Sequence, residues 1–372
     1  MTDSRRRFFQ VGPLSSVLAV CTVSLLLITP IASALATTSG RARAAPTRHG
    51  TVPGKHSSKP HITITEFRLP HAHTWPTDIV AGPDGNMWFT EADSPVNVNT
   101  IIGRITPAGR ITEFRDTLPT QGYSGAAQGL AVGHDGNLWF GENDGFTHIG
   151  WITPAGKINY FHYDDPLLEY SYDFDIRELV WGSDGNLWFT TPSGIGRLTP
   201  SGARTHFHLP DNVTPGGITT GPDGNLWFTA PIATTAIVRD YIGRITPSGV
   251  VTLFRIPTFN SAPKDITVGA GRAMWFTEAG GIGRITTTGK ISEFHDRIPK
   301  SVPQRIAVGK NGNLWFADLP TNSIGRMTST GKVTEYKLPT PHAFAWGVAV
   351  ARNGDIWFTE GQAGRIGLLH IR

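Results

Sequence analysis

GPDGNLWFT, residues 221–229, is the stretch of this sequence that decides the fold. Near copies occur six more times and place a Trp-Phe pair at intervals of 39 to 51 residues. The tryptophans of these pairs are Trp88, Trp139, Trp188, Trp227, Trp275, Trp315 and Trp357. The Asp-Gly or Asn-Gly step in each copy is typical of a tight turn with two positive φ values, and the apolar run after it is typical of a returning strand. Only the fifth copy departs from this pattern, because it has Gly271-Arg272 there.

Two further motifs follow each copy or nearly every copy. An Ile-Gly-Arg motif, or a relative of it, comes after each Trp, as at residues 102–104. In six repeats a second Gly-containing turn then leads to a strand such as Ile111–Phe114. Each repeat therefore predicts four short strands, with no helical pattern between them. Repeats of this length built on hairpins predict an all-β fold, a seven-bladed β-propeller of four-stranded blades.

The two ends of the repeat region complement each other. The seventh repeat reaches residue 372 without its fourth strand, while residues 64–70 have the sequence of such a strand. An N-terminal strand that completes the last blade would close the ring and remove an exposed sheet edge. The alternative is a spare edge strand with a chance likeness. The seven repeated tryptophans are expected to pack between blades, with an aromatic binding groove as the alternative reading.

The first sixty residues lie outside the repeats. Residues 1–36 combine an arginine cluster, an apolar run and a small-residue end, which predicts an export signal that resembles the twin-arginine type. The protein is then extracellular or at the cell surface. The alternative is a membrane anchor formed by residues 11–36, because the apolar run approaches membrane-spanning length. Residues 37–60 predict a disordered basic linker, and residues 61–372 the propeller.

Charge and cysteine use narrow the class of partner. Residues 1–60 carry a net charge of +7, which leaves −3 of the chain's +4 for residues 61–372. Without a basic stripe on the propeller, nucleic acid is not an expected partner. The single cysteine, Cys21, lies in the predicted signal, so the propeller has no disulfide. A monomer is expected, and a membrane is a partner only if the signal remains uncleaved.

The repeats resemble those of the streptogramin B lyase (virginiamycin B lyase) family. The likeness rests on the motifs DGNLWFTE, IGRIT and ITEF, as in residues 82–91, 102–106 and 111–114. It covers residues 61–372 and implies a seven-bladed propeller. It also implies the family's best-known activity, a carbon–oxygen lyase reaction that opens a cyclic depsipeptide antibiotic by elimination at an ester, with Mg²⁺ as cofactor.

Several family positions carry different residues in this chain. The resemblance implies a His after the Pro at the start of the first strand in each of the last two blades. Gln304 and Trp346 stand at these positions. A family Glu falls on Phe344, and a further family acid lies near Glu360, displaced by one residue. Because neither Gln nor Trp can abstract a proton, the chain departs from the family where the chemistry needs a base.

Other residues on the same predicted face are candidates for chemistry. His342 and His73 lie in loops before inner strands, where a neutral imidazole could act as a base beside Glu360. The alternative is that both are solvated loop residues. Acids also recur at the end of the second strand, and carboxylates there could bind Mg²⁺ or Ca²⁺ or could serve the blade itself. The candidate metal ligands are Glu91, Glu278, Asp318 and Glu360.

The starts of the inner strands bring mixed charges to the predicted mouth of the ring. The candidate ligand-binding residues are Asp78, Arg177, Lys264, Asp265, Gln304, Arg305 and Trp346. Such a set suits a small-molecule or peptide ligand with a carboxylate, because Arg binds that group with two hydrogen bonds. The alternative is a network that only neutralises itself.

Three functions remain open from the sequence. The first is an exported propeller that binds a ligand or partner, which the unmatched family histidines favour. The second is a metal-dependent lyase of the streptogramin type with a rearranged base. The third is a lactonase-type hydrolase, which also uses acids at a propeller mouth. P-loop, dinucleotide, zinc and serine-nucleophile motifs are absent from the sequence.

Overall fold

The computed structural model divides the chain into two units, residues 1–57 and 58–372. The structure describes residues 62–71, 74–92, 100–115, 127–143, 147–161, 176–210, 212–232, 238–295 and 301–371, all of which belong to the second unit. These residues contain strands and turns but no helix, and therefore no helix that could span a membrane. The predicted export signal, anchor and linker lie outside the described residues.

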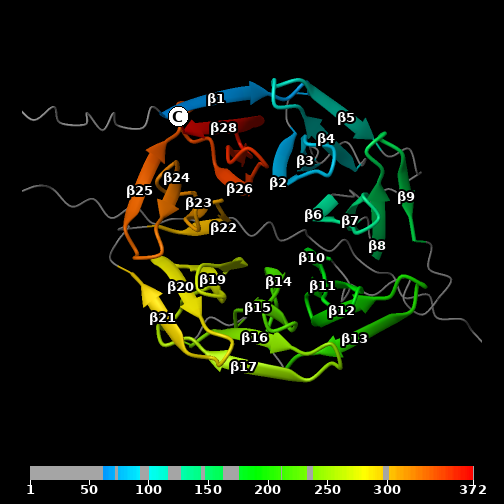
Figure 1. The fold of residues 1–372 in the computed structure, drawn as a ribbon, viewed down its shortest axis with the longest axis vertical. Helices are drawn as coiled ribbons and strands as arrows, with labels where there is room; N and C mark the ends of the chain where they lie inside the picture. The colour runs from blue at the N-terminus through cyan, green and yellow to red at the C-terminus, as the bar shows by residue number, and fades with distance from the viewer. Residues whose placement is uncertain are drawn as a thin grey trace, which may run out of the picture. The chain divides into compact units, whose positions relative to one another are not determined.

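The described strands form seven four-stranded antiparallel sheets, each of which is one blade of a β-propeller (Figure 1). The predicted fold class is confirmed. In six blades the strands pair in sequence order, from the inner strand near the centre of the ring to the outer strand at its edge. The seventh blade takes its outer strand from the other end of the repeat region.

The four strand positions recur around the ring. The inner strands are β2 (Trp75–Ala81), β6 (Ala127–Val132), β10 (Glu178–Trp181), β14 (Ile218–Thr220), β18 (Ile266–Gly269), β22 (Pro303–Val308) and β26 (Ala345–Val350). The second strands are β3 (Met87–Ala92), β7 (Leu138–Asn143), β11 (Leu187–Thr191), β15 (Leu226–Ala230), β19 (Ala273–Glu278), β23 (Leu314–Asp318) and β27 (Ile356–Glu360).

The third strands are β4 (Ile101–Ile105), β8 (Thr147–Ile152), β12 (Gly194–Leu198), β16 (Tyr241–Ile245), β20 (Gly281–Ile285), β24 (Ser323–Met327) and β28 (Arg365–Ile371). The outer strands are β5 (Ile111–Arg115), β9 (Ile158–Tyr160), β13 (Arg204–His208), β17 (Val251–Arg255), β21 (Ile291–Phe294), β25 (Val333–Lys337) and β1 (Ile62–Arg68). Blades are numbered 1 to 7 from the blade that begins with β2.

The predicted closure of the ring is confirmed. β1 pairs with β28 along its whole length, from Ile62 opposite Ile371 to Arg68 opposite Arg365 (Figure 1). Glu66 of β1 also accepts a hydrogen bond from the Thr340 backbone N–H, in the loop between blades 6 and 7 (3.0 Å). The last blade therefore has no exposed third strand, which is the usual hazard of an open sheet.

The turn between the first two strands differs from the prediction. In blade 1 only Gly85 has a positive φ, of 82°, and its N–H donates to the Gly82 carbonyl (3.3 Å). This is a four-residue turn closed by one left-handed glycine, so the predicted pair of positive φ values is wrong. The Asp84 carboxylate instead accepts hydrogen bonds from the backbone N–H of Asn86 (3.1 Å) and the indole N–H of Trp88 (3.0 Å).

The fifth copy shows the opposite behaviour. There both Gly271 (φ 75°) and Arg272 (φ 52°) lie in the left-handed region. Without an Asp in this turn, the Trp275 indole N–H faces the Ala270 carbonyl at 3.4 Å. The Asp of the repeat is thus a partner for the Trp rather than a residue chosen for its backbone conformation.

The repeated motifs build one aromatic stack in each blade. In blade 1 the Trp88 ring stacks on Phe114 of the outer strand, with centroids 5.5 Å apart. The Arg104 guanidinium lies 5.3 Å from both rings and donates to the Pro154 carbonyl of the next blade (2.9 Å). Gly103 lies opposite Phe89, where an added Cβ would come within 2.1 Å of the ring. The Ile-Gly-Arg motif therefore serves the blade.

The seven tryptophans pack between blades, as predicted. Trp88 of blade 1 lies in one buried cluster with Leu138 and Phe140 of blade 2, and Trp357 of blade 7 lies in another with Ile79 and Phe89 of blade 1. The five remaining tryptophans of the repeat join neighbouring blades in the same way. Every blade is thus held by apolar burial against the blade that follows it.

Candidate functional site

A central cavity of about 420 Å³ lies where the seven inner strands begin. Every blade contributes at least one lining residue. All seven candidate ligand-binding residues line this cavity, so the structure brings them together: Asp78, Arg177, Lys264, Asp265, Gln304, Arg305 and Trp346. Whether these residues can bind a ligand depends on the geometry of the cavity.

The lining falls into a rim and a floor. In most blades two consecutive residues face the cavity, the first at the rim and the second at the floor. The exposed rim residues are Gln128, Arg177, Lys264 and Trp346. The charged floor residues are Asp78, Glu178, Asp265 and Arg305, of which the three acids are buried. An entering molecule therefore meets two cations and an indole ring before it meets the acids.

In blades 1, 2, 6 and 7, a β-bulge lies at the residues of the inner strand that face the cavity. The register of the inner strand shifts at Pro76/Ile79, Gln128/Ala131, Pro303/Ile306 and Ala345/Val348. Two consecutive residues of a regular strand would point to opposite faces. A bulge breaks this alternation and re-aims a side chain, which explains why a rim and a floor residue share one cavity.

Arg305 joins the acids of three blades. Its guanidinium makes an ion pair with Glu178, which comes from blade 3 on another part of the ring. It also lies 3.8 Å from the Asp78 carboxylate and 3.7 Å from that of Asp265. Backbone donors hold Asp265 as well, since Ile266 N–H (2.8 Å) and Ile306 N–H (2.9 Å) donate to it. The floor is thus a network in which one cation faces three acids.

The imbalance of the floor changes its protonation. Burial, together with the neighbouring acids Asp78 and Asp265, raises the pKa of Glu178 to about 8 against the opposing effect of Arg305. Burial also raises the pKa of Asp265. Burial opposes the charge of Arg305, but the three acids outweigh it and raise the pKa of its guanidinium. At neutral pH we therefore expect a charged Arg305 and one proton held within the group of three acids.

Threonines of the Trp-Phe-Thr motif connect the inner strand of one blade to the inner strand of the next blade through hydrogen bonds. Thr277 accepts a hydrogen bond from the Asp265 N–H in its own blade (3.0 Å) and donates to the Gln304 carbonyl of blade 6 (2.9 Å). Thr359 similarly accepts from Gly347 N–H (2.7 Å) and donates to the Thr77 carbonyl of blade 1 (2.8 Å). This role was not predicted from the sequence, although the recurring Thr was a signal for it.

The two described candidate catalytic residues, His342 and Glu360, do not line this cavity. His342 is exposed in the loop before β26, with a φ of 53°, and is not among the lining residues. Glu360 is fully buried at the end of β27, where burial and the nearby Glu66 raise its pKa to about 8. The structure gives no hydrogen bond or ion pair between these two described residues. His73 lies outside the described residues.

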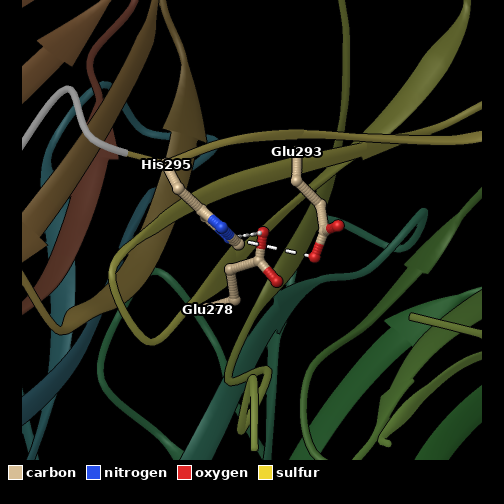
Figure 2. A group of neighbouring side chains, drawn as sticks. All are labelled: Glu278, Glu293 and His295. Atoms are coloured by element: carbon tan, nitrogen blue, oxygen red, sulfur yellow. Dashed lines mark hydrogen bonds and ion pairs between the residues drawn. The ribbon is translucent and has the colours of Figure 1, made fainter. Parts of the chain in front are cut away.

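The four candidate metal ligands are all buried, and each lies at the end of its own second strand. Asp318 accepts a hydrogen bond from the Val302 N–H (3.1 Å), which is the structural use that the sequence left open. Among the described residues, a group of three or more potential metal ligands forms only around Glu278, with Glu293 and His295 (Figure 2). The structure therefore does not bring Glu91, Glu278, Asp318 and Glu360 into one shared site.

Comparison with known proteins agrees with the repeats and the fold. The model of the virginiamycin B lyase family matches residues 54–170 and 169–372. The chain belongs to this family. A solved streptogramin B lyase is 32% identical, with a TM-score of 0.72, over 84% of this chain and 98% of that chain. A catalytically inactive variant of virginiamycin B lyase from Staphylococcus aureus, solved with quinupristin, is 34% identical, with a TM-score of 0.71, over 83% and 99%.

More distant structures share the fold alone. PorZ, a surface component of the type-IX secretion system of Porphyromonas gingivalis, is 15% identical, with a TM-score of 0.63 over 81% of this chain and 47% of that chain. No curated protein sequence matches the chain. The assignment to the virginiamycin B lyase family thus rests on the family model and on solved lyases.

The Mg²⁺ that the virginiamycin B lyase family implies does not fit the cavity. Mg²⁺ binds carboxylate and water oxygens in a strict octahedral arrangement. The three floor acids already face the Arg305 guanidinium, which would repel a divalent cation. Three of the positions where the resemblance implies family residues carry Gln304, Trp346 and Phe344, and none of these offers a carboxylate. Glu360, near the fourth position, is buried and does not line the cavity. Gln304 instead donates its side-chain amide to the Val302 carbonyl (2.7 Å).

Proposed function

We propose that this protein binds, in its central cavity, a small molecule or peptide end that carries an acidic group. The observation that carries the proposal is the rim, where Arg177 and Lys264 are exposed cations and Trp346 is 42% exposed. The Lys264 ammonium makes no ion pair with any described residue. A cation that can donate hydrogen bonds, together with an exposed indole face, suits a ligand that has a carboxylate and a flat or apolar body.

The proposed binding can be tested with matched pairs of ligands. The full chain would be titrated calorimetrically with small aromatic carboxylates and with the corresponding primary amides. We expect the acids to bind at least about 10-fold more tightly, because a hydrogen bond to a charged group contributes roughly 1.5–3 kcal/mol. We expect Lys264→Ala to weaken binding of the acids by about 10- to 100-fold and to leave the amides almost unchanged.

The control variant is Lys290→Ala, which removes another exposed lysine of blade 5, in the turn between β20 and β21. It should bind the acids as the parent chain does. Equal affinity for acids and amides, or equal losses in both lysine variants, would contradict binding through the cationic rim.

Membership of the virginiamycin B lyase family favours a second candidate function, the ring opening of a streptogramin-type depsipeptide. The described lining residues include no histidine that could accept a proton, and they do not fit Mg²⁺. We therefore expect no turnover of quinupristin in the presence of Mg²⁺, as followed by mass spectrometry. Opening without added water would establish the lyase instead, and incorporation of heavy oxygen from water would point to a lactonase-type hydrolase.

We also propose that the ligand is met outside the cytoplasm. The arginine cluster and apolar run of residues 1–36 support export, and the absence of cysteine from residues 61–372 is compatible with it. N-terminal sequencing of the protein from the extracellular fraction should then give a start close to residue 37. A chain that keeps residues 1–36 in the membrane fraction would favour the anchor formed by residues 11–36.

A further inference from the structure

Blade 5 contains a group of three potential metal ligands outside the central cavity. Glu278 at the end of β19, Glu293 in β21 and His295 directly after β21 point toward one another (Figure 2). His295 Nε2 lies 2.9 Å from Glu278 Oε1 and 3.8 Å from Glu293 Oε1. One ligand atom from each residue lies within 4.8 Å of the other two.

One oxygen of the buried Glu278 carboxylate lacks a hydrogen-bond partner. The side chain is fully buried, and its Oε2 atom has no hydrogen-bond partner. A buried polar atom without a partner is rare and costs free energy. Glu293 is the second acid of the group, and its Oε1 atom accepts a hydrogen bond from the Thr258 N–H (3.2 Å). A cation beside these carboxylates would supply the missing partner.

The surroundings add negative charge and little positive charge. Asp240 lies close enough for its charge to raise the pKa of Glu278. Its own oxygens already accept hydrogen bonds from Ile232 N–H (2.8 Å), Ala262 N–H (2.8 Å) and the Ser261 hydroxyl (3.2 Å). Among the described residues, no lysine or arginine forms an ion pair with Glu278 or Glu293. Of the described residues, only His295 pairs with these two acids, and it is a cation only when it is protonated.

Other blades show how the same position is normally balanced. Blades 1, 6 and 7 also have an acid at the end of the second strand and a Glu in the outer strand. In each of them a nearby cation balances the outer-strand Glu. The pairs are Arg115–Glu113 at 3.7 Å, Lys337–Glu335 at 3.8 Å and Arg365–Glu66 at 2.6 Å.

Blade 5 has neither an Arg nor a Lys at the two positions from which these cations come. His295 follows the aromatic residue of the outer strand, where blades 1 and 6 have Arg115 and Lys337. Gly281 lies opposite Glu278, where blade 7 has Arg365 opposite its own acid. Blade 5 thus keeps the two acids but has an imidazole, which is a metal ligand when neutral, in place of a fixed positive charge.

We propose that Glu278, Glu293 and His295 bind a divalent transition-metal ion of the Zn²⁺ or Mn²⁺ type. Imidazole nitrogen combined with carboxylate oxygen suits these ions, whereas Ca²⁺ and Mg²⁺ prefer oxygen ligands alone. The His295 side chain is 26% exposed, which gives an ion access from solvent. Three protein ligands leave a position for water, and the bound ion connects the end of β19 to the outer strand β21.

Zinc binding by the full, untagged chain tests this site. The protein would be treated with a chelator, dialysed and titrated with Zn²⁺ by calorimetry, with the bound metal determined by elemental analysis. We expect one equivalent to bind at this site and the melting temperature to rise by roughly 4–8 °C at about 100 times the dissociation constant. His295→Arg and Glu278→Gln should each weaken this binding by more than about 100-fold.

His295→Arg is designed to keep the fold, because blade 1 carries Arg at the same position. We expect it to melt in chelator at or above the temperature of the parent chain. If it unfolds instead, Glu278→Gln decides, since that change keeps the shape of the side chain. The matched control is Glu335→Gln in blade 6, which should bind Zn²⁺ as the parent chain does.

Three results would contradict metal binding at this site. The first is a parent chain whose melting temperature does not respond to Zn²⁺. The second is equal Zn²⁺ affinity in the parent chain, His295→Arg and Glu278→Gln, which would place the ion elsewhere on the chain. The third is Ca²⁺ or Mg²⁺ binding as tight as that of Zn²⁺, since an imidazole ligand would then contribute nothing.

Discussion

Arg305 shows how much one side chain can determine in a ring-shaped protein. It faces acids from three other blades, and its ion pair with Glu178 spans 127 residues of sequence. A buried carboxylate that loses its only cation is much more costly than a surface one, because water cannot compensate for the charge. The stability of the ring centre therefore depends on this guanidinium and on the protonation of the acids around it.

We predict that Arg305→Met lowers the free energy of unfolding by about 3–5 kcal/mol at pH 8 and by clearly less at pH 5. The raised pKa of Glu178, about 8, means that the folded chain holds a proton that the unfolded chain releases above its ordinary pKa of 4.5. Stability from this proton is complete below pH 4.5 and is lost as the pH rises through 8. Without Arg305, more of the acids must be neutral in the folded chain, so the penalty grows with pH.

Urea denaturation at the two pH values measures this effect. Arg110→Met, a change at an exposed arginine in the turn between β4 and β5, is the control and should cost less than about 0.5 kcal/mol at either pH. Equal losses for Arg305→Met at pH 5 and pH 8 would show that the acids do not depend on Arg305 for their charge.

At the scale of the element, most of the blade could be predicted from the sequence. The period of the Trp-Phe pairs predicted the hairpins, because strand pairing within a blade is local. The detailed turn could not be predicted, since Asp84 was interpreted through its backbone preference. Its observed role is to accept a hydrogen bond from the Trp88 indole, four residues further along. A side-chain contact of this kind leaves the same Asp-Gly signature in the sequence as a turn with two positive φ values.

The residues of the central cavity were predictable for a similar reason. Once the inner strand is known, its first residues must lie near the centre of the ring. What the sequence could not give was the partner of each charge, because the cation of blade 6 meets acids of blades 1, 3 and 5. Those contacts depend on the curvature of the ring, which no local pattern encodes.

The group in blade 5 was missed although the sequence carried a signal for it. Residues 111–115 of blade 1 read ITEFR, whereas residues 291–295 of blade 5 read ISEFH. In the sequence, Glu278 groups with the acids of other blades, because they share one position in the repeat. The structure brings Glu278 close to residues of its own blade instead. β19 and β21 both pair antiparallel with β20, so they run in the same direction and end at the same edge of the sheet. A departure from the repeat was the more informative feature.

At the scale of the whole molecule, one strand decides whether the ring is closed. β1 and β28 are nearly 300 residues apart in sequence, yet they pair along seven residues. All other strand pairs within the blades are local hairpins. Closure therefore carries most of the loop entropy of the fold, and a covalent link at this junction should stabilise the protein more than a link elsewhere.

We predict that a disulfide forms between Thr63→Cys and His370→Cys, which lie directly opposite each other on β1 and β28. Directly opposite residues of antiparallel strands have Cα atoms about 4.5–5.5 Å apart, within the range that a disulfide spans. With Cys21→Ser to remove the native thiol, the oxidised protein should migrate faster on a non-reducing gel. Its free energy of unfolding should rise by about 3–5 kcal/mol, because the link closes a very long loop in the unfolded chain.

The control is the pair Thr63→Cys and Lys290→Cys, which places the second thiol on blade 5 instead of on the partner strand. It should remain reduced within the monomer under the same oxidation. Each single-cysteine variant should also form no disulfide within one chain, and could form one only between two chains. If the Thr63/His370 pair did not link, or linked only after partial unfolding, β1 would not occupy the seventh blade in solution. The edge of β28 would then be open to other chains, and association through it would follow.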